Sequence, residues 1–384
     1  MIKIRIQNAA YNTDIRFPIS EAALSEKLDE IYVLKNRESS QSVFVAEVCW
    51  PEEFSMLKNN FANLDELNYL GKRMESFDAL EYDQFIIGVS KLEKPDVKAL
   101  INLTFNLSHF TLCKNVSSYA KLGRAYILNT EGMVSAGDEE EPKYAVIGKK
   151  LIDRGITQVT ARGLLIYDPL DKPEEVYDGK TFPEYYYKNS LLNICAEYKG
   201  RKELLQLPDE ELAIKKAIAR LGKPYMEECS FKIASHNIES AEWVKRIEDI
   251  IKKEGIYEAN AMVKSLDREE MDWDKLSAMV ELAGVHKAAN IAFLAENYDE
   301  FYFIQNVDTE EDVGRYLVDN ESEYNLALEM EDFFDFAGFG EHFAEEHDGR
   351  FINGGFVNFD GDNTLDKFLE DIETESDDIT MGGL

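Results

Sequence analysis

The sequence predicts an α+β fold: an elongated, multi-domain chain with two related units, each made of helices followed by a small α+β part. Three observations support this prediction. The chain has 384 residues, of which 45% are hydrophobic, and this is enough for two or three domains with cores of their own. Segments with apolar residues at helical spacing alternate with short apolar runs that are typical of strands. Blocks of the first half also recur, in the same order, in the second half.

The recurrence is clearest between residues 106–128 and 297–319. "NLSHFTLCKNVSSYAKLGRAYIL" aligns without a gap with "NYDEFYFIQNVDTEEDVGRYLVD", and Gly123-Arg124 of the first block falls on Gly314-Arg315 of the second. Several blocks in one order predict an internal duplication. The further matching blocks downstream are "KYAVIGKKL" (143–151) with "DFAGFGEHF" (335–343), and "ARGLLIYD" (161–168) with "NGGFVNFD" (353–360). Upstream, residues 76–78 match 265–267, and "ISEAALSEKLDEI" (19–31) resembles "IESAEWVKRIEDI" (238–250).

The elements follow in chain order. "MIKIRIQNAAYNTDIRF" alternates apolar and polar residues, which predicts strands at the N-terminus. Each unit then has amphipathic helices, a helix that begins at a Ser or Asp suited to an N-cap, and a last helix that leads through glycine to a strand. The sequence of residues 200–222 predicts a helical segment that connects the two repeats. The expected parts are an N-terminal β-rich unit (1–60), a first repeat (61–190), a helical connector (191–255), a second, strongly acidic repeat (256–360) and an acidic C-terminal tail (361–384).

Cysteine usage and hydropathy predict a cytoplasmic protein. The four cysteines (Cys49, Cys113, Cys195 and Cys229) lie far apart and form no CxxC pair, which favours reduced thiols over disulfides or a zinc site. No apolar run approaches the roughly 18 residues of a membrane helix, and the N-terminus has no signal-peptide core. We therefore expect no membrane association, and no metal or other cofactor.

The charge is strongly negative and unevenly spread. The chain has 42 basic and 75 acidic residues, a formal net charge of −33. Residues 251–384 hold 9 of the basic and 35 of the acidic residues, and aromatic residues alternate with the acids in "EDFFDFAGFGEHF". Such a region is expected to fold, although crowded carboxylates repel one another. A surface of this kind disfavours DNA or RNA as a ligand and favours a protein that itself binds nucleic acid.

"FVNFDGDNTLDKF" (356–368) resembles the nucleophile motif of haloacid-dehalogenase-type phosphatases. In that family one Asp attacks phosphorus and the Asp two residues later transfers the proton, which here would be Asp360 and Asp362. Such a site also needs a Ser or Thr, a Lys and metal-binding acids from later strands, and few residues follow Asp360. Asp360 also aligns with Asp168 of the first repeat, where the rest of the motif is replaced. We therefore expect that the protein is not an enzyme. The same segment, 358–370, has a weak calcium-loop pattern, but its glycine is misplaced and its twelfth position has no Glu.

Three blocks of the second repeat resemble the ArdA antirestriction proteins of plasmids and conjugative transposons. The blocks are the acidic helix Glu311–Val318, the aromatic and glycine-rich Phe333–Phe343, and the strand that begins Gly354-Gly355-Phe356-Val357. The resemblance covers about 285–360, with a weaker echo in 98–168. Members of this family are usually about half as long and dimeric. For this longer chain, the resemblance therefore implies either a monomer with internal pseudo-symmetry or a homodimer.

The resemblance implies that the protein mimics DNA. Carboxylates would stand in place of phosphates and occupy the DNA-binding groove of a type I restriction-modification enzyme or a similar defence complex. The alternative is an acidic protein–protein interaction module of a mobile element that docks on a basic partner. The acids expected to act as the mimic are Glu310, Glu311, Asp312, Asp319, Glu321, Glu323, Glu329, Glu331, Asp332, Asp335, Glu341, Glu345, Glu346 and Asp348.

Overall fold

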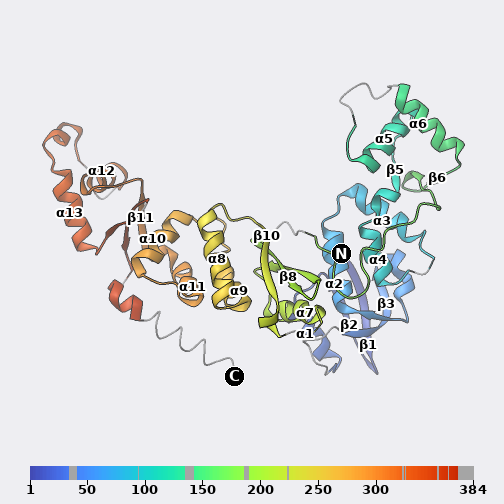
Figure 1. Ribbon diagram of the computed structural model, residues 1–384, viewed down its shortest axis with the longest axis horizontal. Coiled ribbons are helices and arrows are strands. Elements are labelled where there is room, and N and C mark those ends of the chain that lie inside the picture. The colour runs from blue at the N-terminus through green and yellow to red at the C-terminus, as the bar shows by residue number, and fades with distance from the viewer. Residues whose placement is uncertain are drawn as a thin grey trace. The chain divides into compact units, whose positions relative to one another are not determined.

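The computed structural model has an α+β fold, as the sequence predicts, with helices packed around several small antiparallel sheets (Figure 1). It describes residues 1–33, 41–93, 95–134, 142–185, 190–222, 225–321, 324, 326–352, 354–361 and 363–370. The chain divides into two compact units. Unit 1 contains 1–187, 197–204 and 210–229, and unit 2 contains 188–196, 205–209 and 230–384.

Unit 1 begins with a four-stranded sheet of order β2-β1-β3-β4. Its strands are β1 (Ile2–Asn8), β2 (Tyr11–Phe17), β3 (Ser42–Trp50) and β4 (Phe61–Asn63), and α1 (Glu21–Glu30) follows β2. Ile2, Ile4 and Ile6 are fully buried, because alternate residues of a strand share one face. Ser20 caps α1 by accepting a hydrogen bond from the amide of Ala23.

The rest of unit 1 is a helical layer and a second sheet. Asn63 and Asp78 cap α2 and α3 with their side chains, and Asp78 also forms a capping box with Glu81. The second sheet is antiparallel, with the order β5-β7-β6. The elements are η1 (Glu52–Leu57), α2 (Leu64–Glu75), α3 (Ala79–Val89), α4 (Val97–Thr104), η2 (Leu107–His109), β5 (Thr111–Cys113), α5 (Tyr119–Glu131), α6 (Pro142–Asp153), β6 (Thr157–Thr160) and β7 (Gly163–Ile166).

Residues 191–255 are not the helical connector that we expected. They contain β8 (Leu192–Tyr198), β9 (Arg201–Leu207), α7 (Glu211–Arg220), η3 (Met226–Glu228), β10 (Ser230–His236) and most of α8 (Ala241–Lys253), and the strands form a sheet of order β10-β8-β9. The turn of the β8–β9 hairpin is Lys199-Gly200, where both residues have positive φ. Every second residue of β9 is buried from Glu203 on, but its sequence does not alternate, because Leu204 and Leu205 are adjacent, and so it also fits a helix.

Unit 2 continues with a helical layer and a three-stranded antiparallel sheet of order β11-β13-β12. Ile304, Val313, Leu317 and Phe356 form a core between this sheet and the α12/α13 pair, and α10 also packs against the sheet. The elements are α9 (Ile256–Leu266), α10 (Trp273–Ala283), α11 (Ala288–Glu296), η4 (Tyr298–Glu300), β11 (Phe301–Gln305), α12 (Glu310–Asn320), η5 (Leu328–Phe333), α13 (Phe336–Glu346), β12 (Arg350–Ile352) and β13 (Gly355–Phe359).

The expected acidic tail is folded in its first part. Residues 365–370 are helical, and Leu365 and Phe368 are buried. The ring of Phe368 packs on Phe293, Phe301 and Phe359. Residues 371–384, which complete the tail, lie outside the described residues.

Two helix pairs, α5/α6 and α12/α13, pack backbone against backbone through glycine. A Cβ atom on Gly314 would meet the carbonyl of Phe336, and one on Gly340 would meet the carbonyl of Glu310. The same arrangement joins Gly123 to Tyr144 and Gly148 to Tyr119. In each pair the start of one helix lies beside the interior of the other, so the two helices run antiparallel where they cross.

Replacing Gly340 with Ala should destabilise the α12/α13 pair. In an isolated helix this change would add about 1 kcal/mol of helix propensity. Here the methyl group would overlap the Glu310 carbonyl. We therefore expect a net loss of roughly 1–3 kcal/mol, typical of overpacking. Urea unfolding and amide exchange in α12 and α13 measure it. Glu341→Ala, at the exposed neighbouring position, is the control and should change little. Unchanged exchange in Gly340→Ala would show that the close contact does not hold the pair together.

A buried charged cluster joins α7 to the first helices within unit 1. Lys216 is 5% exposed and donates to Glu21 at 2.7 Å and to Asp65 at 3.0 Å. Arg220 pairs with Glu203, which is 2% exposed, at 2.9 Å. Burial raises the pKa of Glu21 and of Glu203 against the opposing effect of these cations.

Lys216→Ala should cost about 3 kcal/mol of unfolding free energy, because it removes the buried cation that Glu21 and Asp65 share and leaves Asp65 only Arg220, at 3.8 Å. Denaturant unfolding measures the loss. Lys215, one residue earlier, is exposed to solvent at 38% of its side chain and pairs with Glu211, so Lys215→Ala is the matched control. Equal effects of the two substitutions would contradict a special role for the buried ion pair.

Candidate interaction surface

The described acids among those predicted lie on α12, η5 and α13 or directly beside these helices. Capping residues determine where α12 and α13 begin, and so which acids lie on them. The Thr309 side chain accepts a hydrogen bond from the Asp312 amide, and the Asp312 carboxylate accepts one in return from the Thr309 amide. Asp335 caps α13 by accepting from the amide of Gly338 at 3.0 Å. Acids in the first turn of α12 also interact favourably with the helix dipole.

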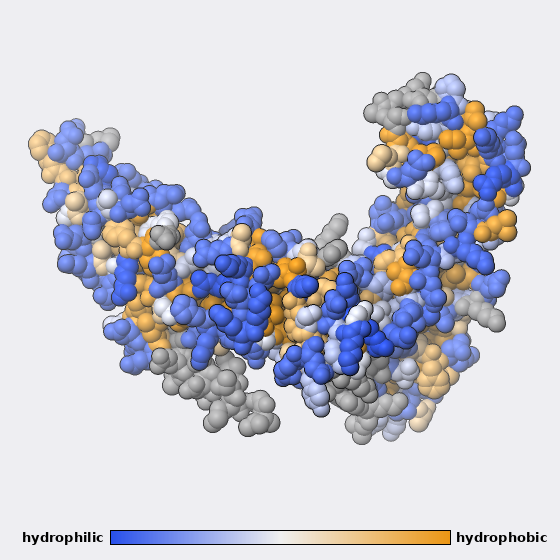
Figure 2. Space-filling view, in the orientation of Figure 1, coloured by the Kyte–Doolittle hydropathy of each residue, from blue (hydrophilic) through white to orange (hydrophobic). Residues whose placement is uncertain are grey.

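The structure exposes most of these acids. Glu321 and Glu331 are half-buried, and Glu323 lies outside the described residues. The surface over α12 and α13 is mainly hydrophilic (Figure 2). The exposed acids are Glu310, Glu311, Asp312, Asp319, Glu329, Asp332, Asp335, Glu341, Glu345, Glu346 and Asp348.

Several of the predicted acids also have a partner within the fold. Glu311 pairs with Arg315 at 2.8 Å, and Glu346 lies 3.8 Å from His342. Glu321 accepts a hydrogen bond from the Tyr302 hydroxyl at 2.5 Å. Asp312 and Asp335 cap the two helices and Glu321 joins the end of α12 to β11, whereas the pairs of Glu311 and Glu346 are exposed and lie within one helix. Sequence patterns suggested acidity here, but they did not separate these structural acids from the others.

The remaining acids lie on α12, η5 and α13, or just after α13 in the case of Asp348, and have no partner within the described part of the fold. Among the described residues, their side chains make no hydrogen bond and no ion pair with any other residue. They therefore stay hydrated and available to an external cationic partner. These acids are Glu310, Asp319, Glu329, Glu331, Asp332, Glu341, Glu345 and Asp348.

Further exposed acids precede α10 in the same unit, and our sequence analysis did not include them. Asp267, Glu269 and Glu270 are exposed in the segment before this helix. Asp299 is also exposed and pairs with Arg268 at 3.1 Å. The run "DREEMDWD" was a visible signal. It lies before residues 285–360, which the family resemblance covers and from which the candidate acids were taken.

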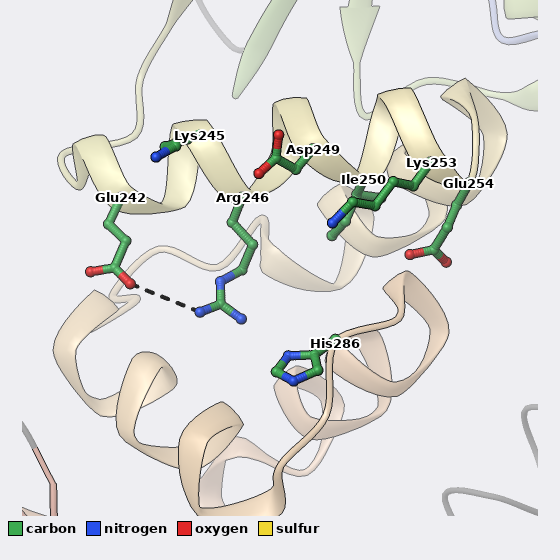
Figure 3. A pocket seen from close by; sticks show the side chains of 8 residues that line it. All are labelled: Glu242, Lys245, Arg246, Asp249, Ile250, Lys253, Glu254 and His286. Carbon is green, nitrogen blue, oxygen red and sulfur yellow. Dashed lines mark ion pairs between the residues drawn. The ribbon is translucent and has the colours of Figure 1, made fainter.

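A shallow pocket of about 320 Å³ lies beside α8 (Figure 3). Arg246 and Glu242 form an ion pair at 3.9 Å along α8, on one side of the pocket, and His286 comes from the segment that precedes α11. Its charged groups are mixed in sign, so the pocket attracts neither anions nor cations strongly. It is lined by Glu242, Lys245, Arg246, Asp249, Ile250, Lys253, Glu254 and His286.

The phosphatase-like segment begins in the last described strand of unit 2. Asp360 follows β13, the central strand of the antiparallel sheet, and its amide donates to the carbonyl of Glu300 at 2.7 Å. The second Asp of the motif, Asp362, lies outside the described residues, which also leaves part of the calcium-loop-like segment 358–370 outside them. Over the described ranges, no group of three or more His, Cys, Asp or Glu side chains is arranged to hold a metal ion.

In the part of the chain that the structure describes, no helix is long and apolar enough to cross a membrane. No protein-family model matches the chain, and no curated protein sequence matches it.

The α12 cap should give the helix a pH dependence. Hydrogen bonds from the Thr309 hydroxyl and from the amides of Asp308 and Thr309 lower the pKa of Asp312. A carboxyl group with a lowered pKa stabilises the fold above its unfolded pKa of about 4, and this stabilisation is lost as the pH falls through the lower folded value.

Amide exchange of α12 between pH 7 and pH 3, in the wild type and in Asp312→Asn, measures this effect. The wild type should lose protection as the carboxyl group becomes protonated, and Asp312→Asn should be less protected at pH 7 and lack this acid-dependent loss. Asp319→Asn on the same helix is the control. If Asp312→Asn followed the wild type at every pH, the cap would not stabilise α12.

Proposed function

We propose that the protein is a non-enzymatic antirestriction protein that mimics DNA and blocks the DNA-binding groove of a type I restriction-modification enzyme or a similar defence complex. The observation that carries the proposal is the α12/α13 pair. Its two helices are locked together by glycine contacts, and its outer surface carries carboxylates that no described residue neutralises. A rigid anionic surface loses little conformational entropy on binding.

The spacing of these carboxylates supports the proposal. Glu341 and Glu345 are four residues apart on α13, and such positions on a helix lie about 5–6 Å apart. B-DNA carries about one charge per 1.7 Å of axis, counting both strands, and phosphate contacts supply much of the affinity of DNA-binding proteins. One row of carboxylates is therefore about three times sparser than the charge of DNA, so that several rows on neighbouring helices must act together, and carboxylates present no base edges. A mimic of this kind would therefore inhibit enzymes that recognise different DNA sequences.

We also propose that the chain is an internal duplication that extends beyond the blocks aligned in the sequence. The sheets β5-β7-β6 and β11-β13-β12 have the same strand order, and so do β2-β1-β3 and β9-β8-β10. Asn68 of α2 exchanges two hydrogen bonds with the backbone of Ile19, at 2.8 and 3.0 Å. Asn260 of α9 makes the same two bonds to Asp209, both at 2.9 Å. These pairs support a repeat unit that begins with the first strands of each half. In this alignment α7 corresponds to α1, whereas the sequence blocks 19–31 and 238–250 matched α1 with α8.

Restriction of unmodified phage in cells with a type I system tests the proposed function. Expression of the protein should relieve restriction, and a variant with Glu310→Gln, Asp319→Asn, Glu341→Gln and Glu345→Gln should lose most of this relief. These four acids are exposed and have no role in capping or in an ion pair, so the variant should remain folded, which circular dichroism checks.

The matched control removes four exposed acids of the first half, by Glu26→Gln, Glu52→Gln, Asp153→Asn and Glu174→Gln, and should retain full relief. Equal loss in both variants would mean that net charge, not the α12/α13 surface, is responsible. No relief by the folded wild-type protein would contradict antirestriction against that system. The acidic interaction module would then be the better explanation, with the second repeat used to capture its basic partner.

A further inference from the structure

The α5/α6 and α12/α13 pairs have the same backbone contact but opposite charge. In α5 and α6 together, five Lys and Arg residues stand against two acids. In α12 and α13 together, seven acids stand against one Arg. The connection between α5 and α6 adds four acids at 138–141, which lie outside the described residues, so the comparison concerns the helices alone.

The glycines align the two pairs position by position. Two residues before the first glycine, Lys121 takes the place of Asp312. One residue after the second glycine, Lys149 takes the place of Glu341. Two other aligned positions keep the same sign, Arg124 with Arg315 and Asp153 with Glu345, so the opposition lies in the net charge of the two pairs and in these lysines.

Apolar side chains add to the α5/α6 surface. Tyr119 is 53% exposed, Leu128 47% and Val146 55%. Tyr119 and Leu128 stand where α12 has Glu310 and Asp319. Exposed apolar groups surrounded by charged ones mark an interaction surface. The acidic pair has exposed apolar side chains beside it as well, because Phe333 of η5 is 84% exposed and Met330 is 55% exposed.

We propose that the α5/α6 surface binds the α12/α13 surface of a second copy of this chain. Two surfaces of the same shape pack face to face around an approximate two-fold axis, as in isologous dimers. Two acidic pairs placed in this way would repel each other, whereas a pair with a net positive charge and a pair with a net negative charge attract each other. The buried part of the contact would be supplied by Tyr119, Leu128 and Val146 against Phe333 and Met330.

This association does not depend on the proposed antirestriction function, but it uses the same acidic surface. A restriction enzyme and a second copy of the chain would therefore compete for α12 and α13. Self-association is measured with the purified protein alone, so its failure and the failure of antirestriction are distinguishable.

Sedimentation of two charge-reversed variants, alone and mixed, tests the proposal. The first variant carries Lys121→Glu, Lys149→Glu and Lys150→Glu, so that both helix pairs are acidic. The second carries Glu310→Lys, Asp319→Lys and Glu341→Lys, so that both are basic or neutral. The wild type should associate at low ionic strength, and its association should weaken about ten-fold or more at high salt. Each variant alone should sediment as a monomer, and an equimolar mixture should recover the association.

The control variant reverses three exposed lysines on other elements of unit 2, by Lys232→Glu, Lys245→Glu and Lys253→Glu, and should associate like the wild type. Circular dichroism establishes that every variant is folded. A wild type that stays monomeric at low salt would overturn the proposal, and so would association that survives in either single variant. Labelled duplex DNA provides a further test. If the wild type bound DNA through Lys121, Lys149 and Lys150 and did not self-associate, the partner of the α5/α6 surface would be nucleic acid instead.

Discussion

The close contact between α12 and α13 is the constraint on which the rest of the acidic unit depends. Gly314 and Gly340 bring the two backbones together without any charged side chain, and Ile304, Val313 and Phe356 bury the face that meets the sheet. Carboxylates crowded on one surface repel one another, and this repulsion destabilises the fold. Since the contact is made by backbone and apolar groups, the outer faces are free to carry acids.

The α5/α6 pair has the same glycine contact as α12/α13 but a different outer surface. In this chain the packing of a helix pair therefore does not determine its surface charge. Gly123 and Gly148 fix the geometry, as Gly314 and Gly340 do in the second pair. The outward positions are not constrained by packing, and there the two pairs diverge to opposite charge. We interpret the glycines as residues that the fold needs, and the outward-facing residues as those that determine what each helix pair can bind.

The sequence predicted the α+β class and the later elements of each half because repeated blocks and glycines located them. It missed the β8–β9 hairpin because short apolar runs among charged residues fit a helix as well as a strand, and no aligned block covered them. The exposure of the acids was predictable from their helical positions. The structural roles of Glu321 and Asp335 were not, because they depend on Tyr302, which is distant in sequence, and on the residue at which α13 begins.

Only some of the acids on the α12/α13 surface can bind an external partner, so the net charge of the chain overstates the charge that is available for binding. The formal charge counts Asp312 and Glu311 equally with Glu341, yet the first two are committed to Thr309 and Arg315. A partner with a basic groove would gain most from carboxylates that give up only water and counterions on binding. Carboxylates that must first leave an internal partner offer less, because breaking that bond offsets part of the gain. The number of unengaged acids, more than the net charge of the chain, therefore sets how strongly the α12/α13 surface attracts a cationic partner.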